Sequence, residues 1–440
     1  MSAKIFKATI LFSIFTLAAQ ILGLVRDLYL TRIFGIGEVL DTYYLAFKVP
    51  DFLNIFYSVF LGSVIFIPLL IQAKHKDGQE DNKQQVQKKI NIIASLVICL
   101  LILVFAVLYI FMPNISQILA PSWGIEQQIL LTKLSRILLF AQFLFPVGIL
   151  AGALGMVYGK PIGMALSGFF YNAGILGFSI LLIPVFGIYG VAVAVLLGAL
   201  CFVLIQIYPK EVRQYFWNFS FRVDFSEWKG FILKNQGRFV AVLATQIFGV
   251  MVLFIAGLSG TGGVSTFSIS YNLYLAAYFI LGASFSTVLM PGISERFVKG
   301  DTITQKKSLR QSLLIMFIIS AFCAIILFFL SIFIVSILYS MSKLDTDQII
   351  SVASLLSILA VSLPFFNCTE VLRKYLYATN QILLTGSSTF YILFATVVGY
   401  MVLVNQFSIQ TLVALCLAID LAIITAFIGL LGILRFKRQV

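Results

Sequence analysis

Long apolar runs alternate with short polar links along almost the whole chain. Continuous runs of about 18 or more apolar residues are typical of helices that cross a bilayer. The pattern therefore predicts an all-α polytopic membrane protein with about twelve transmembrane helices. We place these helices at residues 8–33, 41–72, 90–112, 129–157, 161–183, 187–208, 236–258, 265–292, 309–340, 348–377, 381–404 and 407–434.

Three of the predicted helices contain an internal proline: Pro50, Pro146 and Pro364. Proline has no backbone N–H to donate, and its ring clashes with the preceding turn of a helix. Sharp helix kinks have a short list of causes, of which proline is the commonest. We therefore expect the second, fourth and tenth helices to bend or unwind near these residues.

The composition agrees with a membrane protein and changes how the net charge is interpreted. The chain is 61% hydrophobic and 11% charged, with a formal charge of +13, whereas soluble domains are about 45–50% apolar. The basic residues gather at the two termini and in alternate links, which are 73–89, 209–235, 293–308 and 373–380. Four of the intervening links contain no Lys or Arg, and these are 113–128, 184–187, 259–264 and 405–407. Cytoplasmic loops are rich in Lys and Arg, so both termini are predicted to be cytoplasmic and no nucleic-acid partner is expected.

Two halves of the chain resemble each other weakly. The segment 62–78 has an approximate counterpart in 282–300, with a helix, a proline, basic residues and a closing glycine. Both copies end on the predicted cytoplasmic side, which indicates a parallel repeat of two six-helix lobes. The predicted domains are an N-terminal lobe (1–208), a cytoplasmic linker (209–235) and a C-terminal lobe (236–440).

The sequence offers no enzymatic pattern. Its single histidine, His75, lies in a charged link, which excludes His-based triads and multi-histidine metal sites in the membrane. The chain also has no Walker or G-x-S-x-G motif. We expect neither an enzyme nor a bound cofactor or metal.

Charged side chains cluster in the apolar segment 20–72. A charge at the centre of a membrane helix costs roughly 2.5–3.5 kcal/mol on insertion scales, so such residues usually serve a function. Arg26 and Lys48 are candidate contacts for a substrate phosphate, because arginine matches phosphate oxygens with a planar fork of donors. Asp27 and Asp41 are predicted to line the same cavity and to pair with these cations when it is empty. The alternative is that the charges form internal ion pairs or extend to the interface.

Uncharged polar residues and one carboxylate also lie at membrane depth. Asn54 and Asn272 are further candidate cavity residues, whereas Asn172, Gln246 and Asn367 are expected to make interhelical hydrogen bonds. Asp420 is an isolated carboxylate in the twelfth predicted helix. It is a candidate coupling site for a proton or monovalent cation, and its alternative role is a polar contact with a neighbouring helix.

The segment 22–54, LGLVRDLYLTRIFGIGEVLDTYYLAFKVPDFLN, resembles the MurJ/MviN lipid II flippases of the multidrug/oligosaccharidyl-lipid/polysaccharide exporter superfamily. The matching motifs are G-x-x-R-D, F-G-x-G and D-x-x-x-x-A-F-K-x-P-x-x-L. A second, weaker match is VSTFSISYNLYLAAYFILGASFSTVLMPGISERF, residues 264–297.

The resemblance implies a flippase of the bacterial inner membrane that moves a polyprenyl-pyrophosphate-linked peptidoglycan precursor, lipid II, to the outer leaflet by alternating access. It also implies that Arg26, Asp27, Asp41 and Lys48 lie in the central cavity. The family commonly has further cavity arginines at three positions that read Gln20, Asn54 and Asn272 here, and a carboxylate for sodium in the seventh helix, where Gln246 is the nearest polar residue.

We therefore predict a monomeric lipid II flippase with a lipid-linked sugar precursor, the bilayer and a monovalent cation or proton as its partners. Besides a non-transporting scaffold of this fold, in which the charges form internal pairs, two other functions remain open from the residues alone. One is a flippase for another lipid-linked glycan, of the O-antigen or capsule type. The other is a cation-coupled multidrug exporter, for which the cationic Arg26 and Lys48 are unfavourable because its cargo is cationic.

Overall fold

The computed structural model describes residues 3–75, 82–283, 302–379 and 381–436, and every secondary-structure element in them is a helix. Within these residues, ten helices are long and apolar enough to cross a membrane. The number is eleven if a bent pair, Thr346–Ala360 with Leu363–Leu376, counts as one span. The prediction of an all-α polytopic membrane protein is confirmed.

The chain forms two compact units. The first unit comprises residues 1–26 and 45–246, and the second comprises residues 27–44 and 247–440. The boundaries fall inside three helices, namely α1 (Ala3–Phe34), α2 (Glu38–Ala46) and α12 (Phe225–Gly257). The linker predicted at 209–235 thus groups with the first unit, and a short N-terminal segment groups with the second.

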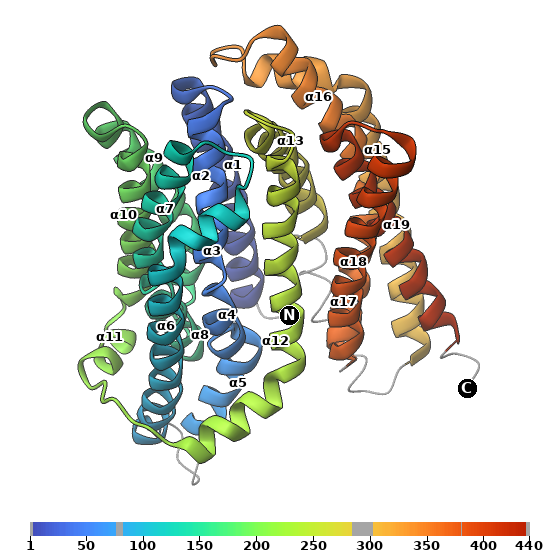
Figure 1. The fold of residues 1–440 in the computed structure, drawn as a ribbon. Coiled ribbons are helices and arrows are strands. Elements are labelled where there is room, and N and C mark those ends of the chain that lie inside the picture. Colours follow the sequence, from blue (N-terminus) through green and yellow to red (C-terminus); the bar gives the residue numbers. More distant parts are fainter. Residues whose placement is uncertain (1–2, 76–81, 284–301, 380, 437–440) are drawn as a thin grey trace. The chain divides into compact units, whose positions relative to one another are not determined.

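The first unit is a helical bundle. Its α9 and α10 run side by side over most of their length (Figure 1), and α10 also packs on α7 and α8. Besides parts of α1, α2 and α12, the unit contains α3 (Lys48–Asp51), α4 (Asn54–Phe60), α5 (Ser63–Lys74), α6 (Lys83–Leu119), α7 (Ile125–Ala141), α8 (Leu144–Val157), α9 (Ile162–Phe186), α10 (Ile188–Ile207) and α11 (Lys210–Trp217).

The second predicted span, 41–72, is broken into the short helices α2 to α5. Around Pro50 the backbone makes tight i→i+3 hydrogen bonds, from Phe52 N to Val49 O (3.1 Å) and from Leu53 N to Pro50 O (3.0 Å). A second break follows at Gly62, whose backbone is extended. None of the four pieces is long enough to span a bilayer alone, which explains why the structure has fewer continuous spans than the twelve predicted.

The other two proline predictions are also confirmed. Pro146 lies in the first turn of α8, directly after the break that separates α8 from α7. Pro364 lies in the first turn of α17 (Leu363–Ala378), after a 49° bend from α16 (Thr346–Ala360). Proline is favoured in the first turn of a helix, where its missing N–H has no intrahelical partner to lose.

The second unit is a separate bundle. In it α18 and α19 lie side by side (Figure 1), α15 packs on α16 and α17, and α13 packs on α16. It contains α13 (Gly263–Tyr278), the π-helical turn η2 (Phe279–Ala283), α15 (Thr302–Leu338), α16, α17, α18 (Ile382–Phe407) and α19 (Thr411–Phe436). The second copy of the predicted repeat and much of the basic link 293–308 lie outside the described residues.

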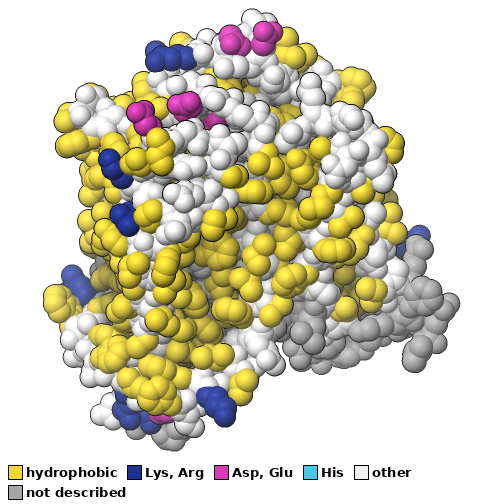
Figure 2. All heavy atoms as spheres, viewed as in Figure 1, with side chains coloured by type: hydrophobic (Ala, Val, Ile, Leu, Met, Phe, Trp, Pro, Cys, Tyr) yellow, Lys and Arg dark blue, Asp and Glu magenta, His cyan; other side chains and the backbone are white. Residues whose placement is uncertain are grey.

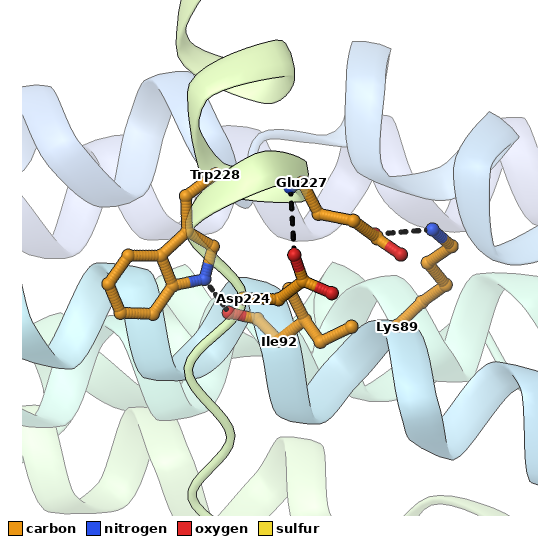
Figure 3. A network of polar contacts seen from close by, with 5 residues as sticks. All are labelled: Lys89, Ile92, Asp224, Glu227 and Trp228. Carbon is orange, nitrogen blue, oxygen red and sulfur yellow. Dashed lines mark hydrogen bonds and ion pairs between the residues drawn. The ribbon is translucent and has the colours of Figure 1, made fainter.

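The segment after α11 is tied to α6 by a network of polar contacts (Figure 3). Asp224 caps α12, because its carboxylate accepts from the Glu227 amide at 3.0 Å. The Trp228 indole donates to the Ile92 carbonyl at 2.9 Å, and Lys89 pairs with Glu227 at 2.5 Å. The start of α12 is therefore held on the first unit.

The surfaces of the helices are those expected in lipid. Figure 2 shows hydrophobic side chains over much of the viewed face, and several Lys and Arg at the lower end of the first unit. Large apolar side chains are exposed along whole helices, for example Phe329 and Phe333 on α15, at 76% and 63%. Because lipid tails solvate such side chains, this exposure is consistent with helices that face the bilayer.

Candidate functional site

The predicted site residues divide between the two units. Arg26, Lys48 and Asn54 belong to the first unit, and Asp27, Asp41, Asn272 and Asp420 belong to the second.

Arg26 of α1 is held by α9. Its guanidinium donates to the Asn172 side-chain oxygen at 3.3 Å. The Asn172 amide nitrogen in turn donates to the backbone oxygens of Ala19 and Gly168, both at 3.2 Å. Sequence reasoning correctly assigned Asn172 an interhelical hydrogen bond. It did not foresee that this bond positions Arg26, because residues 146 apart in sequence carry no pattern that links them.

Lys48 and Asn54 lie on either side of the Pro50 break. Lys48 begins α3 and is half-buried, and its positive charge acts on Asp51, which ends the same helix. Asn54 begins α4 and accepts a hydrogen bond from Ser58 one turn later. The broken backbone therefore presents a cation, a carboxylate and an amide within seven residues.

Asp27 and Asn272 are brought together in the second unit. The Asn272 amide nitrogen donates to the Asp27 carboxylate at 2.9 Å, across 245 residues of sequence. Asp27 is only 5% exposed, and its backbone oxygen also accepts from the Thr31 hydroxyl at 2.8 Å. A buried carboxylate requires such partners, since an unpaired one is costly at membrane depth.

Asp41 caps the start of α13. Its carboxylate accepts from the backbone amides of Gly262 and Ser265 and from the Ser265 hydroxyl, each at 2.6 Å. The side chain is fully buried. The first N–H groups of a helix have no intrahelical partner and attract negative charge. Asp41 therefore has a structural role in the second unit that its place in the sequence did not reveal.

Asp420 of α19 belongs to a buried polar cluster to which α13 and the turn between α16 and α17 also contribute. It is 5% exposed and interacts with the Ser362 hydroxyl, which is 3.0 Å from the Tyr274 hydroxyl. One carboxylate oxygen of Asp420 has no hydrogen-bond partner among the described residues. Sequence reasoning found Asp420 from its isolation in an apolar run but missed Tyr274 and Ser362, because single hydroxyls are common in membrane helices.

The structure offers no cluster for a catalytic or structural metal within the residues it describes. These residues contain no group of three or more His, Cys, Asp and Glu side chains that could hold an ion. What the two units do offer is a small number of ionisable and amide side chains at membrane depth. That combination is typical of transporters, in which such residues mark substrate and ion pathways.

Solved structures share the fold of this chain. The chain aligns with the inward closed conformation of lipid II flippase MurJ with a TM-score of 0.81 and 19% identity, over 97% of this chain and 87% of that one. An inward-facing multidrug resistance MATE transporter of the MOP superfamily gives a TM-score of 0.77 and 15% identity, over 96% and 95%. At these identities the likeness concerns the fold: the chain has the fold of a multi-pass membrane transporter.

Sequence comparison identifies the family. The family model described as lipid II flippase MurJ matches residues 30–439, so the chain belongs to the MurJ family. A probable lipid II flippase MurJ of Buchnera aphidicola subsp. Acyrthosiphon pisum is 26% identical over 86% of this chain and 74% of its own. The lipid II flippase MurJ of Burkholderia cenocepacia is 22% identical over the same shares. The predicted resemblance is confirmed, and the glycan-flippase and multidrug alternatives are not favoured.

Proposed function

We propose that this protein carries lipid II from the inner to the outer leaflet of the bacterial cytoplasmic membrane. The observation that carries the proposal is the family match over residues 30–439, which includes nearly the whole of both units. Two compact helical units also suit alternating access, in which lobes move relative to each other around a site near the membrane midplane.

Arg26 is the proposed anchor for the pyrophosphate. Guanidinium is always charged and binds phosphate oxygens with two parallel hydrogen bonds. Arg26 is partly exposed, and its guanidinium donates a hydrogen bond to the neutral Asn172 side-chain oxygen. Lys48, which is half-buried in the same unit, supplies a second and more mobile cation.

Asp27 and Asn272 are proposed to line the cargo pathway from the second unit. A carboxylate bonded to an amide can exchange that bond for one to a sugar hydroxyl or a cation when cargo is present. Asp41 contributes indirectly in this proposal, because it fixes the start of α13, and α13 carries Asn272 nine residues after Gly263.

Asp420 is the proposed coupling site. One oxygen of its carboxylate accepts no hydrogen bond from any described residue. The Ser362 hydroxyl, which contacts Asp420, is 3.0 Å from the Tyr274 hydroxyl. Oxygen ligands of this kind suit a proton or a monovalent cation. Coupling at Asp420 would let an ion gradient drive cargo release in the second unit.

The proposed orientation places both termini in the cytoplasm and the protein acts as a monomer. The orientation is supported by the Lys and Arg in the links 73–89 and 209–235 and by their absence from 113–128 and 184–187. No chemical transformation of the cargo is required, so the proposed protein is a transporter and not an enzyme.

A genetic experiment tests this function. The gene is expressed in a bacterial strain in which the resident lipid II flippase can be depleted, and growth and cell shape are followed. We expect rescue by the wild-type protein and by Arg32→Ala, because Arg32 lies exposed near the end of α1. We expect no rescue by Arg26→Ala at equal protein level. Failure of the wild-type protein, when it is made and inserted, would contradict the proposal.

A further inference from the structure

A cavity of about 320 Å³ lies inside the first unit. It is lined by residues of α3, α4, α7, α8, α9 and α10 and of the turns beside them. Its polar lining consists of Asp51, Asn54, Tyr57, Ser58, Gln142 and Tyr171. Among these, only Asn54 was foreseen as a cavity residue. This cavity has no role in the mechanism proposed above.

The backbone is broken on two sides of the cavity. One side is the Pro50 break, where Leu53 N bonds to Pro50 O at 3.0 Å. The other is the join of α7 and α8, where Gln142 N bonds to Leu139 O at 3.2 Å. Irregular backbone at membrane depth is tolerated where it is buried in protein or lines a polar cavity. Two breaks that meet at one cavity indicate a built site.

The polar groups around the cavity include both donors and acceptors. The Tyr57 hydroxyl donates to the Gln142 side-chain oxygen at 2.6 Å, and Ser58 donates to the Asn54 oxygen. Each amide thus has its oxygen engaged, which leaves its NH₂ group as a donor. The Asp51 carboxylate accepts no hydrogen bond from any residue that the structure describes. A ligand here would meet amide donors and a carboxylate acceptor together.

The volume of the cavity and the charges beside it limit which class of ligand could bind there. A water molecule takes about 30 Å³ of liquid volume, so the cavity would hold on the order of ten waters and is too large for a bare ion. Small-molecule sites begin at roughly 300 Å³. The positive charge of Lys48 acts on Asp51, which makes the site unfavourable for an organic cation, and the carboxylate makes it unfavourable for phosphate. A neutral ligand with many hydroxyl and amide groups fits best.

The cavity adjoins the proposed pyrophosphate anchor. Tyr171 lines the cavity, and the next residue, Asn172, accepts the hydrogen bond from Arg26. The charge of Arg26 also acts on the Tyr171 phenol. Aromatic side chains on the wall, Phe47 and Phe145, give flat apolar surfaces for the faces of a ring.

We propose that this cavity binds a sugar ring of the lipid-linked cargo while Arg26 holds the adjoining pyrophosphate, an inference that rests on the proposed function. Asp51 accepts from sugar hydroxyls, and the Asn54 and Gln142 amides donate to hydroxyl or acetamido oxygens. The first unit thereby recognises the glycan as well as the phosphate.

Binding of two lipids to the full-length protein in nanodiscs, measured by native mass spectrometry, tests the inference. The lipids are lipid II and undecaprenyl pyrophosphate, which has no sugar. The variants are Asp51→Ala, which removes the acceptor, and Val195→Phe, which fills the cavity from α10. Asp347→Ala and Val185→Phe make the same chemical changes at exposed positions.

We expect both cavity variants to weaken lipid II binding about tenfold, as for loss of a hydrogen bond to a charged group, and to leave undecaprenyl pyrophosphate binding unchanged. Equal effects on the two lipids, or no effect on either, would overturn the inference. The inference would also be overturned if lipid II binding by Asp51→Ala no longer depended on sodium or protons while the preference for lipid II over undecaprenyl pyrophosphate stayed intact. That result would mark Asp51 as part of a cation site. If the proposed function is correct, Arg26→Ala weakens the binding of both lipids. Failure of the proposed function therefore shows in Arg26→Ala, and failure of the sugar site shows in Asp51→Ala and Val195→Phe.

Discussion

The carboxylate of Asp41 binds both the backbone amide and the hydroxyl of Ser265, which lies 224 residues further along the chain. With Gly262, Ser265 opens α13, and Asp41 supplies the negative charge that this helix start requires. A residue from the first fifth of the sequence is thus built into the second unit. A segment rich in motifs can thus have a structural role in one part, at Asp41, and a proposed ligand-binding role in another, at Arg26.

Replacement of this cap should weaken the second unit. Asp41→Asn keeps the shape of the side chain but removes its charge and one acceptor, and places an NH₂ group against backbone donors. We expect a loss of about 2 kcal/mol, the range for a cap and for hydrogen bonds to a charged group. Thermal unfolding in detergent measures it, with exposed Asp347→Asn as the control. An unchanged melting temperature for Asp41→Asn would show that the cap contributes nothing.

Asp27 and Asn272 should be energetically coupled. Asp27→Ala and Asn272→Ala each remove one partner of the 2.9 Å hydrogen bond. The double variant should therefore lose less unfolding free energy than the two single variants lose in sum. We expect a coupling energy of about 1 kcal/mol, as found for interhelical polar contacts in membranes. A double-mutant cycle on unfolding free energies gives the value. Strict additivity would mean that the two side chains do not depend on each other.

The contact between the linker and α6 should depend more on Trp228 than on the ion pair beside it. Trp228→Phe leaves the Ile92 carbonyl without its donor, at an expected cost of about 1 kcal/mol. Lys89→Met breaks a pair whose side chains are 31% and 34% exposed, and such pairs are worth about 0–1 kcal/mol. The rate of amide hydrogen exchange in residues 225–235 compares the two variants. Trp217→Phe is the matched control, because Trp217 is 81% exposed. Faster exchange in Lys89→Met than in Trp228→Phe would reverse this ranking.

Asp420 should control coupling and not cargo binding. Asp420→Asn is expected to abolish the stimulation of transport by a proton or sodium gradient and to leave lipid II affinity within about twofold. The carboxamide fits the same space beside Ser362 but cannot take up a proton or balance a cation. The measurement is the rate of lipid II transport by proteoliposomes with and without a proton gradient or a sodium gradient, for the wild-type protein and for Asp420→Asn. Full stimulation in Asp420→Asn would place coupling elsewhere.

The parts of the fold that local chemistry decides could be predicted from the sequence. Apolar run lengths located most of the spans, and Pro50, Pro146 and Pro364 located the helix breaks, because proline acts on its own backbone. The sequence could not show that Pro50 and a second break at Gly62 divide one span into four short helices. That outcome depends on the neighbouring helices that accommodate the freed backbone groups.

The sequence allows the residue types of the candidate site to be proposed, but it does not show how these residues pair. Arg26 and Asp27 stood out because charge is rare in apolar runs, yet their partners Asn172 and Asn272 lie 146 and 245 residues away. Asp51 does not stand out in the sequence, because its significance depends on the cavity around it. Long-range contacts of this kind are set by packing, which leaves no periodic signal in the chain.

The most direct test of the account is the translocation of labelled lipid II in proteoliposomes that contain the purified protein. Wild-type protein and Arg32→Ala are predicted to move lipid II across the bilayer at equal rates. Arg26→Ala is predicted to lower the rate at least about tenfold, as expected for the loss of a charge-assisted phosphate contact. Translocation by Arg26→Ala at the wild-type rate would contradict the role of Arg26, and no translocation by correctly inserted wild-type protein would contradict the proposed function itself.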